Sequence, residues 1–257
     1  MSSQIIGYYI PYKKKLLRKF GTTSERMRAS VVARYGEEFT NTLQKEVRQQ
    51  YDDLIPEIPY IRGPRARMLN TFLLISAQEL AVYRAMAEHG KSPGEAWELC
   101  HKALRLRLSE IPQWKRRIMR QFMFSRVVRR IMAKRFRKKQ KTRFGDFEIE
   151  YLIGEGDDFD FGVNYLQCGN YEFVKRHGGE EFAPYVCMSD IALGEAMGWG
   201  LRRTQTLADG CPHCDFRFKD GATTHISSKT LRVQETIVRI RKREAEQGST
   251  TTVERRR

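Results

Sequence analysis

Residues 183–220 read APYVCMSDIALGEAMGWGLRRTQTLADGCPHCDFRFKD, and the predicted fold is built outward from this stretch. Apolar residues recur at helical spacing over 190–197 and stop at two glycines, which predicts one short helix. The segment 201–207 has the Thr and Leu content of a strand, and Asp209-Gly210 is typical of a turn. Residues 215–218 then alternate between polar and aromatic, as in a half-buried strand. The stretch therefore predicts a helix, a strand, a tight turn and a second strand.

The ends of these predicted elements carry closely spaced reactive side chains. Three of the five cysteines of the chain lie within the stretch. Consecutive elements usually lie next to each other in space, so we expect these side chains to be within reach of one another. The group consists of Cys187, Asp190, Arg203, Cys211, His213, Cys214 and Asp215.

The composition is that of a folded protein. The chain has 257 residues, of which 40% are hydrophobic, and this is enough for one large or two small domains with a real core. The first residues do not have the pattern of a signal peptide, and no apolar run is long enough to predict a membrane span. The five cysteines, one before residue 160 and four after it, favour reduced thiols and a cytoplasmic location.

The N-terminal half is predicted to be mostly helical. Apolar residues recur at helical spacing over 27–47 and over 68–86, and the second run is the most apolar of the chain. Ser92 is placed to cap the next helix, with Pro93 at its first position and Glu95 in the capping-box position. The side chains predicted to fill the core in this region and just beyond it are Trp97, Cys100 and Trp114.

A strongly basic segment follows. The formal net charge of the chain is +16, and residues 115–143 hold fourteen basic residues and no acidic one. Apolar residues on one face predict a single amphipathic helix over about 112–143. This face carries Ile118, Phe122, Val128, Ile131 and Met132.

Three interpretations of the basic helix remain open. Its apolar face can pack on the core with the basic side chains in solvent, it can dock on an anionic membrane surface as in a peripheral membrane protein, or it can bind nucleic acid phosphates. Nucleic acid ranks last, because no recognisable nucleic-acid-binding fold accompanies the charge.

The pattern changes near Gly145. Residues 147–151 and 163–168 predict strands, and the acidic run between them is interpreted as a solvated loop, because it lacks the distal glutamate of a calcium site. The chain is therefore predicted to be α+β, with a helical N-terminal part packed on a smaller mixed α/β domain that carries the cysteine-rich site. The expected divisions are residues 1–144, 145–228 and 229–257, the last being a basic helix with a disordered tail.

The site stretch also resembles a known family, that of L-2-amino-thiazoline-4-carboxylic acid hydrolase. The resemblance covers about residues 65–220 and is strongest over the last forty or so. Weaker similarity lies over 70–90, which looks like the family's helix with a tyrosine-arginine pair, here Tyr83 and Arg84. The CPHC element with Cys211 and His213 departs from the family pattern. The residues that carry the strong similarity are Cys187, Asp190, Arg203-Thr204, Thr206-Leu207-Ala208, Gly210 and Cys214-Asp215-Phe216-Arg217-Phe218.

The resemblance implies a hydrolase that opens a five-membered ring at the amidine-like carbon between nitrogen and sulfur. Ring opening needs a nucleophile, an acidic group to hold the amidinium and a base to deliver water. Cys187, at the entrance of a helix, is the predicted nucleophile, because helix amides favour a thiolate, and Cys214 is the alternative. The other expected roles are amidinium binding by Asp190 and Asp215, base catalysis by His213 or His225, and binding of a small-molecule substrate by Arg203, Thr204 and Thr206. This scheme requires no cofactor.

Zinc is the competing interpretation of the thiols. Cys211 and Cys214 have the C-x2-C spacing of a zinc knuckle, and Cys168 and Cys187 can complete four thiolates. This leads to a second hypothesis, a non-catalytic, zinc-stapled protein that senses a small ligand or acts as a scaffold, with the basic helix as its docking element. Stoichiometric zinc with unfolding on chelation favours this hypothesis, whereas one reactive thiol and no metal favours the hydrolase.

Overall fold

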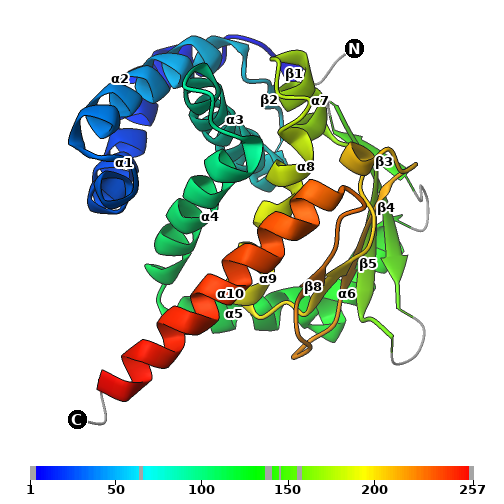
Figure 1. Cartoon of the computed structure of the whole chain (residues 1–257). Helices are drawn as coiled ribbons and strands as arrows, with labels where there is room; N and C mark the ends of the chain where they lie inside the picture. The colour runs from blue at the N-terminus through cyan, green and yellow to red at the C-terminus, as the bar shows by residue number, and fades with distance from the viewer. Residues whose placement is uncertain (1–3, 64–65, 137–140, 145, 155–157, 255–257) are drawn as a thin grey trace.

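The computed structural model describes residues 4–63, 66–136, 141–144, 146–154 and 158–254. The fold is α+β, as the sequence predicts: a helical N-terminal part packs on a mixed sheet with its own short helices (Figure 1). The division into residues 1–144, 145–228 and 229–257 stays a prediction. One continuous cluster of buried apolar side chains includes residues of all three segments.

The N-terminal part is built from long helices. A short pair of strands, β1 (Gln4–Ile5) and β2 (Tyr60–Ile61), lies beside them. The helices are α1 (Lys13–Tyr35), α2 (Glu37–Leu54), α3 (Arg67–Glu88), α4 (Pro93–Ser109), α5 (Gln113–Phe124) and α6 (Arg126–Phe136).

The C-terminal part consists of a sheet and four helices. The strands are β3 (Lys141–Phe144), β4 (Phe147–Ile153), β5 (Phe161–Gln167), β6 (Leu201–Arg203), β7 (Cys214–Phe218) and β8 (His225–Ile226). The helices are α7 (Gly169–Arg176), α8 (Ala183–Val186), α9 (Asp190–Met197) and α10 (Leu231–Glu254), and the end of α10 covers residues for which the sequence predicts disorder.

The sheet has the order β3-β4-β5-β7-β6-β8, and all neighbours are antiparallel except β6 and β8. Tyr165 lies opposite Cys214, and Phe161 lies opposite Phe218, so the inner faces of β5 and β7 are in register. Successive strand residues point to opposite faces of a sheet. Cys214 and Asp215 therefore face opposite sides.

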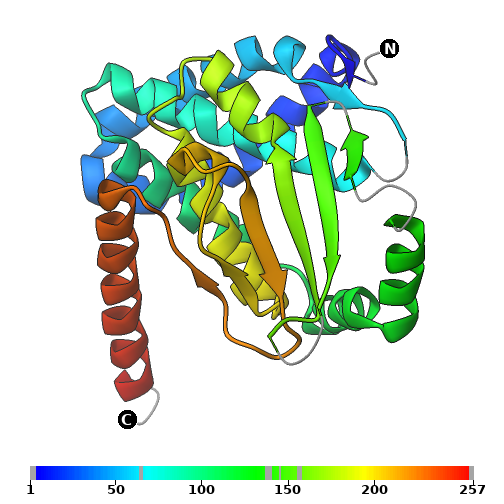
Figure 2. The same ribbon diagram turned by 90° about the vertical axis from the view of Figure 1, so that its right-hand side faces the viewer.

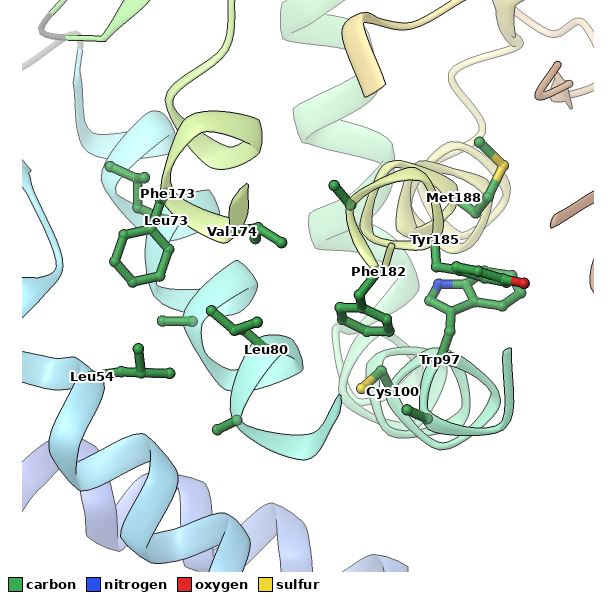
Figure 3. Close-up of a cluster of buried hydrophobic side chains, with 14 of the residues drawn as sticks. Leu54, Leu73, Leu80, Trp97, Cys100, Phe173, Val174, Phe182, Tyr185 and Met188 are labelled. Carbon is green, nitrogen blue, oxygen red and sulfur yellow. The ribbon is translucent and has the colours of Figure 1, made fainter. Parts of the chain in front are cut away.

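The core between the two parts is centred on α4 and α8. Figure 3 shows Phe182 and Tyr185 from the α8 region pointing at Trp97 and Cys100 of α4. Trp97 and Cys100 are buried, which confirms the sequence prediction for both. The ring of Tyr83 on α3 stacks on Phe182 with centroids 4.7 Å apart, so one aromatic contact joins α3 to α8.

The start of α4 has the predicted capping box. The Ser92 hydroxyl accepts from the Glu95 backbone N–H at 3.3 Å, and the Glu95 carboxylate accepts from the Ser92 backbone N–H at 3.2 Å. Two donors that the helix leaves unpaired are satisfied in this way.

Ser92→Ala is expected to lower the free energy of unfolding by about 1 kcal/mol, because it removes the acceptor of the Glu95 N–H. Urea unfolding measures the change. Ser109→Ala at the other end of α4 is the matched control and should be nearly neutral, since the exposed Ser109 hydroxyl bonds only to the Leu106 carbonyl. Equal effects of the two substitutions would contradict a specific role for the cap.

The basic segment differs from the predicted single helix. The segment forms α5 and α6, separated at Ser125, whose backbone is extended (φ −56°, ψ 130°), and its last part is the strand β3. Residues 141–144 pair with β4 as the strand β3, so they do not continue the helix. Trp114 is 60% exposed, so the prediction that it fills the core is wrong.

The apolar face of the segment is only partly covered. Ile118 and Ile131 are 55% and 52% exposed, whereas Val128 and Met132 are half-buried and line the cavity described below. Figure 2 shows α6 at the edge of the molecule beside the lower ends of the long strands, with α5 next to it. In the part of the chain that the structure describes, no helix has the length and apolar character needed to span a bilayer.

Candidate functional site

A cavity of about 590 Å³ lies between the sheet and the helices α3, α5, α6, α7, α8 and α9. Alternate strand residues form one wall, as the period of a strand requires. Apolar side chains of α3, α5 and α6 form most of the opposite wall of the cavity. The strand residues are Phe147, Ile149, Tyr151, Phe161, Val163, Tyr165, Leu201, Arg203, Cys214, Phe216 and Phe218.

An ion pair lies in the wall of this cavity. Arg203 of β6 is 1% exposed, and its Nη1 donates to Asp190 Oδ2 at 2.5 Å and to the Cys187 carbonyl at 2.7 Å. The Phe216 ring lies beneath the guanidinium at 5.4 Å. Asp190 starts α9, where helix dipole and Arg203 both favour a carboxylate. The pair therefore fixes a negative charge at the polar end of an otherwise apolar space.

The cavity sets the electrostatics of this pair. The Asp190 side chain is 27% exposed, but the residue lines the internal cavity, which is enclosed largely by apolar groups. Burial raises the pKa of Asp190, and the Arg203 guanidinium opposes the shift. We regard the ionised pair as the resting state, because two hydrogen-bonded opposite charges stabilise each other in a low-dielectric site.

Three thiols line the same cavity, from Cys168, Cys187 and Cys214. Burial raises the pKa of Cys168 and of Cys214 to about 12, although the Leu207 backbone N–H donates to the Cys214 sulfur at 3.3 Å. Burial also raises the pKa of Cys187, and the nearby Arg203 only partly offsets this. All three groups are therefore neutral thiols at neutral pH.

Glu79 is a site residue that the sequence analysis missed. It lies on α3, is 5% exposed and lines the cavity, and its Oε1 accepts from the Ser189 hydroxyl at 2.7 Å. Burial raises the pKa of Glu79 to about 8, with the Ser189 hydrogen bond opposing the shift. Glu79 and Asp190 both line the cavity, and the charge of Asp190 contributes to the raised pKa of Glu79. The sequence feature that could have identified Glu79 is a carboxyl side chain on the buried face of the most apolar helix.

Several polar atoms of residues that line the cavity lack a hydrogen-bond partner among the described residues. They are Glu79 Oε2, Asn170 Oδ1, Trp199 Nε1 and Arg203 Nε, and all four residues line the cavity. Buried polar atoms are normally paired. The site therefore has unused hydrogen-bonding capacity for a polar group of a ligand.

The structure brings together only some of the predicted site residues. Cys168, Cys187, Asp190, Arg203 and Cys214 line the cavity. The other predicted site residues are Thr204, Thr206, Cys211, His213, Asp215 and His225, and none of them is among its lining residues.

The residues outside the cavity make local contacts. Asp215 accepts from the backbone N–H groups of Thr204 and Gln205 at 2.8 and 2.9 Å and from the Thr204 hydroxyl at 2.6 Å. Thr206 is buried and donates to Asp209 at 2.8 Å, while His213 contacts the Gln205 amide at 3.1 Å. These contacts hold the connection between β6 and β7. The roles predicted for these residues stay predictions.

The zinc prediction also stays a prediction. Cys168, Cys187 and Cys214 share the cavity, whereas Cys211 is buried outside it. Within the described ranges, no three His, Cys, Asp or Glu side chains are grouped so that they could hold a metal ion.

The comparisons agree with the resemblance seen in the sequence. The model of the family described as L-2-amino-thiazoline-4-carboxylic acid hydrolase matches residues 71–218, which is more than half of the chain. No curated protein and no solved structure gives a significant match. The matched range contains β3 to β7 and the three site residues Glu79, Asp190 and Arg203. The chain belongs to the L-2-amino-thiazoline-4-carboxylic acid hydrolase family.

Proposed function

We propose that this protein is a hydrolase that opens a 2-amino-thiazoline-4-carboxylate-like ring, or cleaves a related amidine C–N or C–S bond, with a water molecule as the nucleophile. The observation that carries the proposal is that the cavity is lined by two carboxyl groups in different environments. Asp190 is held beside Arg203, and Glu79 is held by Ser189 with a pKa of about 8. Carboxyl groups with such different environments can divide the roles of base and acid.

In the proposed reaction, the water oxygen bonds to the ring carbon between nitrogen and sulfur, and Asp190 takes the proton that the water loses. The bond from this carbon to the leaving sulfur or nitrogen then breaks. Glu79 gives its proton to the leaving atom, so each carboxyl group ends in the opposite protonation state and a proton exchange with solvent resets the site.

Thiol attack by Cys187 is the alternative route. A thiolate is the reactive form of cysteine, but burial and the neighbouring Asp190 hold the pKa of Cys187 high. Cys187 lies before α9, but this position does not bring its pKa down to the usual range. The neighbouring cation, Arg203, is already paired with Asp190. These environments favour an activated water.

Cys187→Ser and Cys214→Ser are expected to keep turnover of L-2-amino-thiazoline-4-carboxylate, or of a larger cyclic amidine, within about tenfold of the unsubstituted protein, since serine preserves the volume of the site without serving as a thiolate. The assay follows release of a free thiol from the ring. A loss of more than about a thousandfold in one folded variant would assign the nucleophile to that cysteine.

The same preparations test the non-catalytic alternative. Zinc bound in a one-to-one ratio, unfolding on chelation and no turnover of any cyclic amidine would support a zinc-stapled sensor instead of a hydrolase. Cys211→Ser is a useful comparison, because Cys211 lies outside the cavity and matters only to the zinc model.

A further inference from the structure

An apolar surface remains uncovered on α5 and α6. Trp114, Ile118 and Phe122 follow one another at four-residue spacing along α5 and are 60%, 55% and 68% exposed. Val127 and Ile131 continue this pattern on α6 and are also exposed. Contiguous exposed apolar side chains on adjacent helices are uncommon in monomeric proteins and mark an interaction surface. We call these five residues the apolar row.

Basic side chains flank the apolar row. Arg116, Arg120 and Arg129 are engaged with the body of the protein, through the Ala196 carbonyl, Asp220 and Asp160. Other basic side chains of these helices are exposed and make no ion pair with the described residues, and we call four of them the basic set. It consists of Arg117, Arg126, Arg130 and Lys134. Exposed apolar residues between uncompensated cations match an anionic lipid surface, and a tryptophan suits the interface of a bilayer.

The cavity opens at this surface. Met119 and Phe122 line the cavity and are 50% and 68% exposed, so α5 forms part of its mouth. Val128 and Met132 of α6 line it next to the exposed Val127 and Ile131. A lipid layer that covers the apolar row would therefore lie against the entrance of the cavity.

The cavity is much larger and more apolar than a small polar ring requires. Its volume of about 590 Å³ lies within the range of about 300–1,000 Å³ that is typical of pockets for drug-sized ligands. The charged lining residues are Glu79, Asp190 and Arg203, and the lining residues from α5 and α6 are Met, Phe and Val. Near these helices the cavity also has the aromatic side chains of Tyr151 and Trp199, each with one polar atom. This arrangement fits an amphiphile with a polar head at the ion pair and a hydrocarbon part toward the mouth.

We propose that α5 and α6 dock the protein on an anionic bilayer, and that the cavity takes a membrane amphiphile through the mouth between these helices. The substrate class follows from the proposed hydrolase function and rests on it: an amidine or related head group with an apolar tail. The docking itself is independent of the reaction.

Sedimentation with lipid vesicles tests the docking. The full chain is expected to bind phosphatidylcholine vesicles that contain phosphatidylglycerol, to bind pure phosphatidylcholine weakly, and to lose affinity with salt. Replacing all four members of the basic set with Gln should weaken binding by more than a hundredfold, at roughly fivefold for each charge. Four matched substitutions on α1, Lys14, Lys15, Arg18 and Lys19 to Gln, should leave most of the affinity.

The apolar row has its own control. Ile118→Gln with Ile131→Gln should weaken vesicle binding at least tenfold, whereas Leu231→Gln with Val238→Gln, two still more exposed apolar positions on α10, should not. Brominated lipids in the vesicles should quench the tryptophan fluorescence of the bound protein. The Trp114→Phe variant should lack the quenched component. Equal losses in test and control variants, or binding of duplex DNA or RNA with no binding of vesicles, would overturn the docking surface.

A dansyl-labelled long-chain alkylamine, whose cationic head suits the Asp190 carboxylate and offers no bond to hydrolyse, tests the ligand class without turnover. The chain is expected to bind it at micromolar concentration, and Val163→Trp, which fills the cavity wall on β5, should weaken binding at least tenfold. Val238→Trp on the surface is the control. Unchanged binding by Val163→Trp with the fold intact would overturn the amphiphile inference. It would leave the hydrolase proposal standing, because that proposal is decided by turnover of soluble amidines.

Discussion

Replacing Arg203 with methionine is expected to lower the free energy of unfolding by about 3–5 kcal/mol. Arg203 is 1% exposed and is the ion-pair partner of Asp190, and the substitution leaves that carboxylate without its counter-charge. The Cys187 carbonyl also loses its donor. Urea unfolding at neutral pH gives the change, and a melt in the same buffer confirms that the variant starts folded.

Arg202→Met is the matched control for this prediction. Arg202 precedes Arg203 on β6, but it is exposed and faces the other side of the sheet, so its loss should change stability by no more than about 0.5 kcal/mol. The double substitution Arg203→Met with Asp190→Asn should recover part of the loss, because neither charge then remains unpaired. Losses that simply add would show that the two residues are not coupled.

Substitution of Asp190 distinguishes the effect of the ion pair on stability from its effect on catalysis. Asp190→Asn is expected to lower turnover by about 100- to 10,000-fold, the usual contribution of a general base. The amide of the variant still accepts from Arg203, but the buried guanidinium loses its counter-charge, so the variant should be less stable, and turnover is compared at a temperature at which urea unfolding shows it to be folded. Near-normal turnover by folded Asp190→Asn would assign the base to another residue.

The sequence predicts the local pattern of the site well. The alternation of Phe216 and Phe218 with Asp215 and Arg217 predicts β7, and in the structure Cys214 lies on the same cavity-facing side of this strand as Phe216 and Phe218. The spacing of apolar residues after Asp190 predicts α9, which ends with Gly198 in the left-handed region. These features depend on neighbours a few residues apart, and sequence patterns report such neighbours directly.

Contacts between distant segments are less accessible to sequence patterns. Glu79 becomes a site residue only because α3 lies across the cavity from β6 and beside the Ser189 turn. Thr204 and His213, which lie near the motif in sequence, are turned away from the cavity by the connection between β6 and β7. The amphipathic pattern over 112–143 likewise did not reveal the break at Ser125. It also did not reveal β3, because the strand with which β3 pairs lies outside this range.

The protonation of Glu79 gives the second large prediction. In the folded chain its pKa is raised from 4.5 to about 8 by burial, so the native state binds a proton there that the unfolded chain releases above about pH 4.5. The contribution of this group to stability is therefore fully present below pH 4.5, is lost as the pH rises, and levels off above about pH 8. Each pKa unit corresponds to about 1.4 kcal/mol, so the total loss is several kcal/mol.

Glu79→Gln should remove this pH dependence, because glutamine keeps the Ser189 acceptor and the neutral form at every pH. We expect the variant to unfold with nearly the same free energy as the unsubstituted protein at pH 5 and to be more stable by several kcal/mol at pH 8.5. Urea unfolding at a series of pH values measures the difference. Glu88→Gln, at the exposed end of the same helix, is the control and should give a curve parallel to that of the unsubstituted protein. A parallel curve for Glu79→Gln would mean that Glu79 is ionised in the folded state, and the proton donor of the proposed reaction would have to be another group.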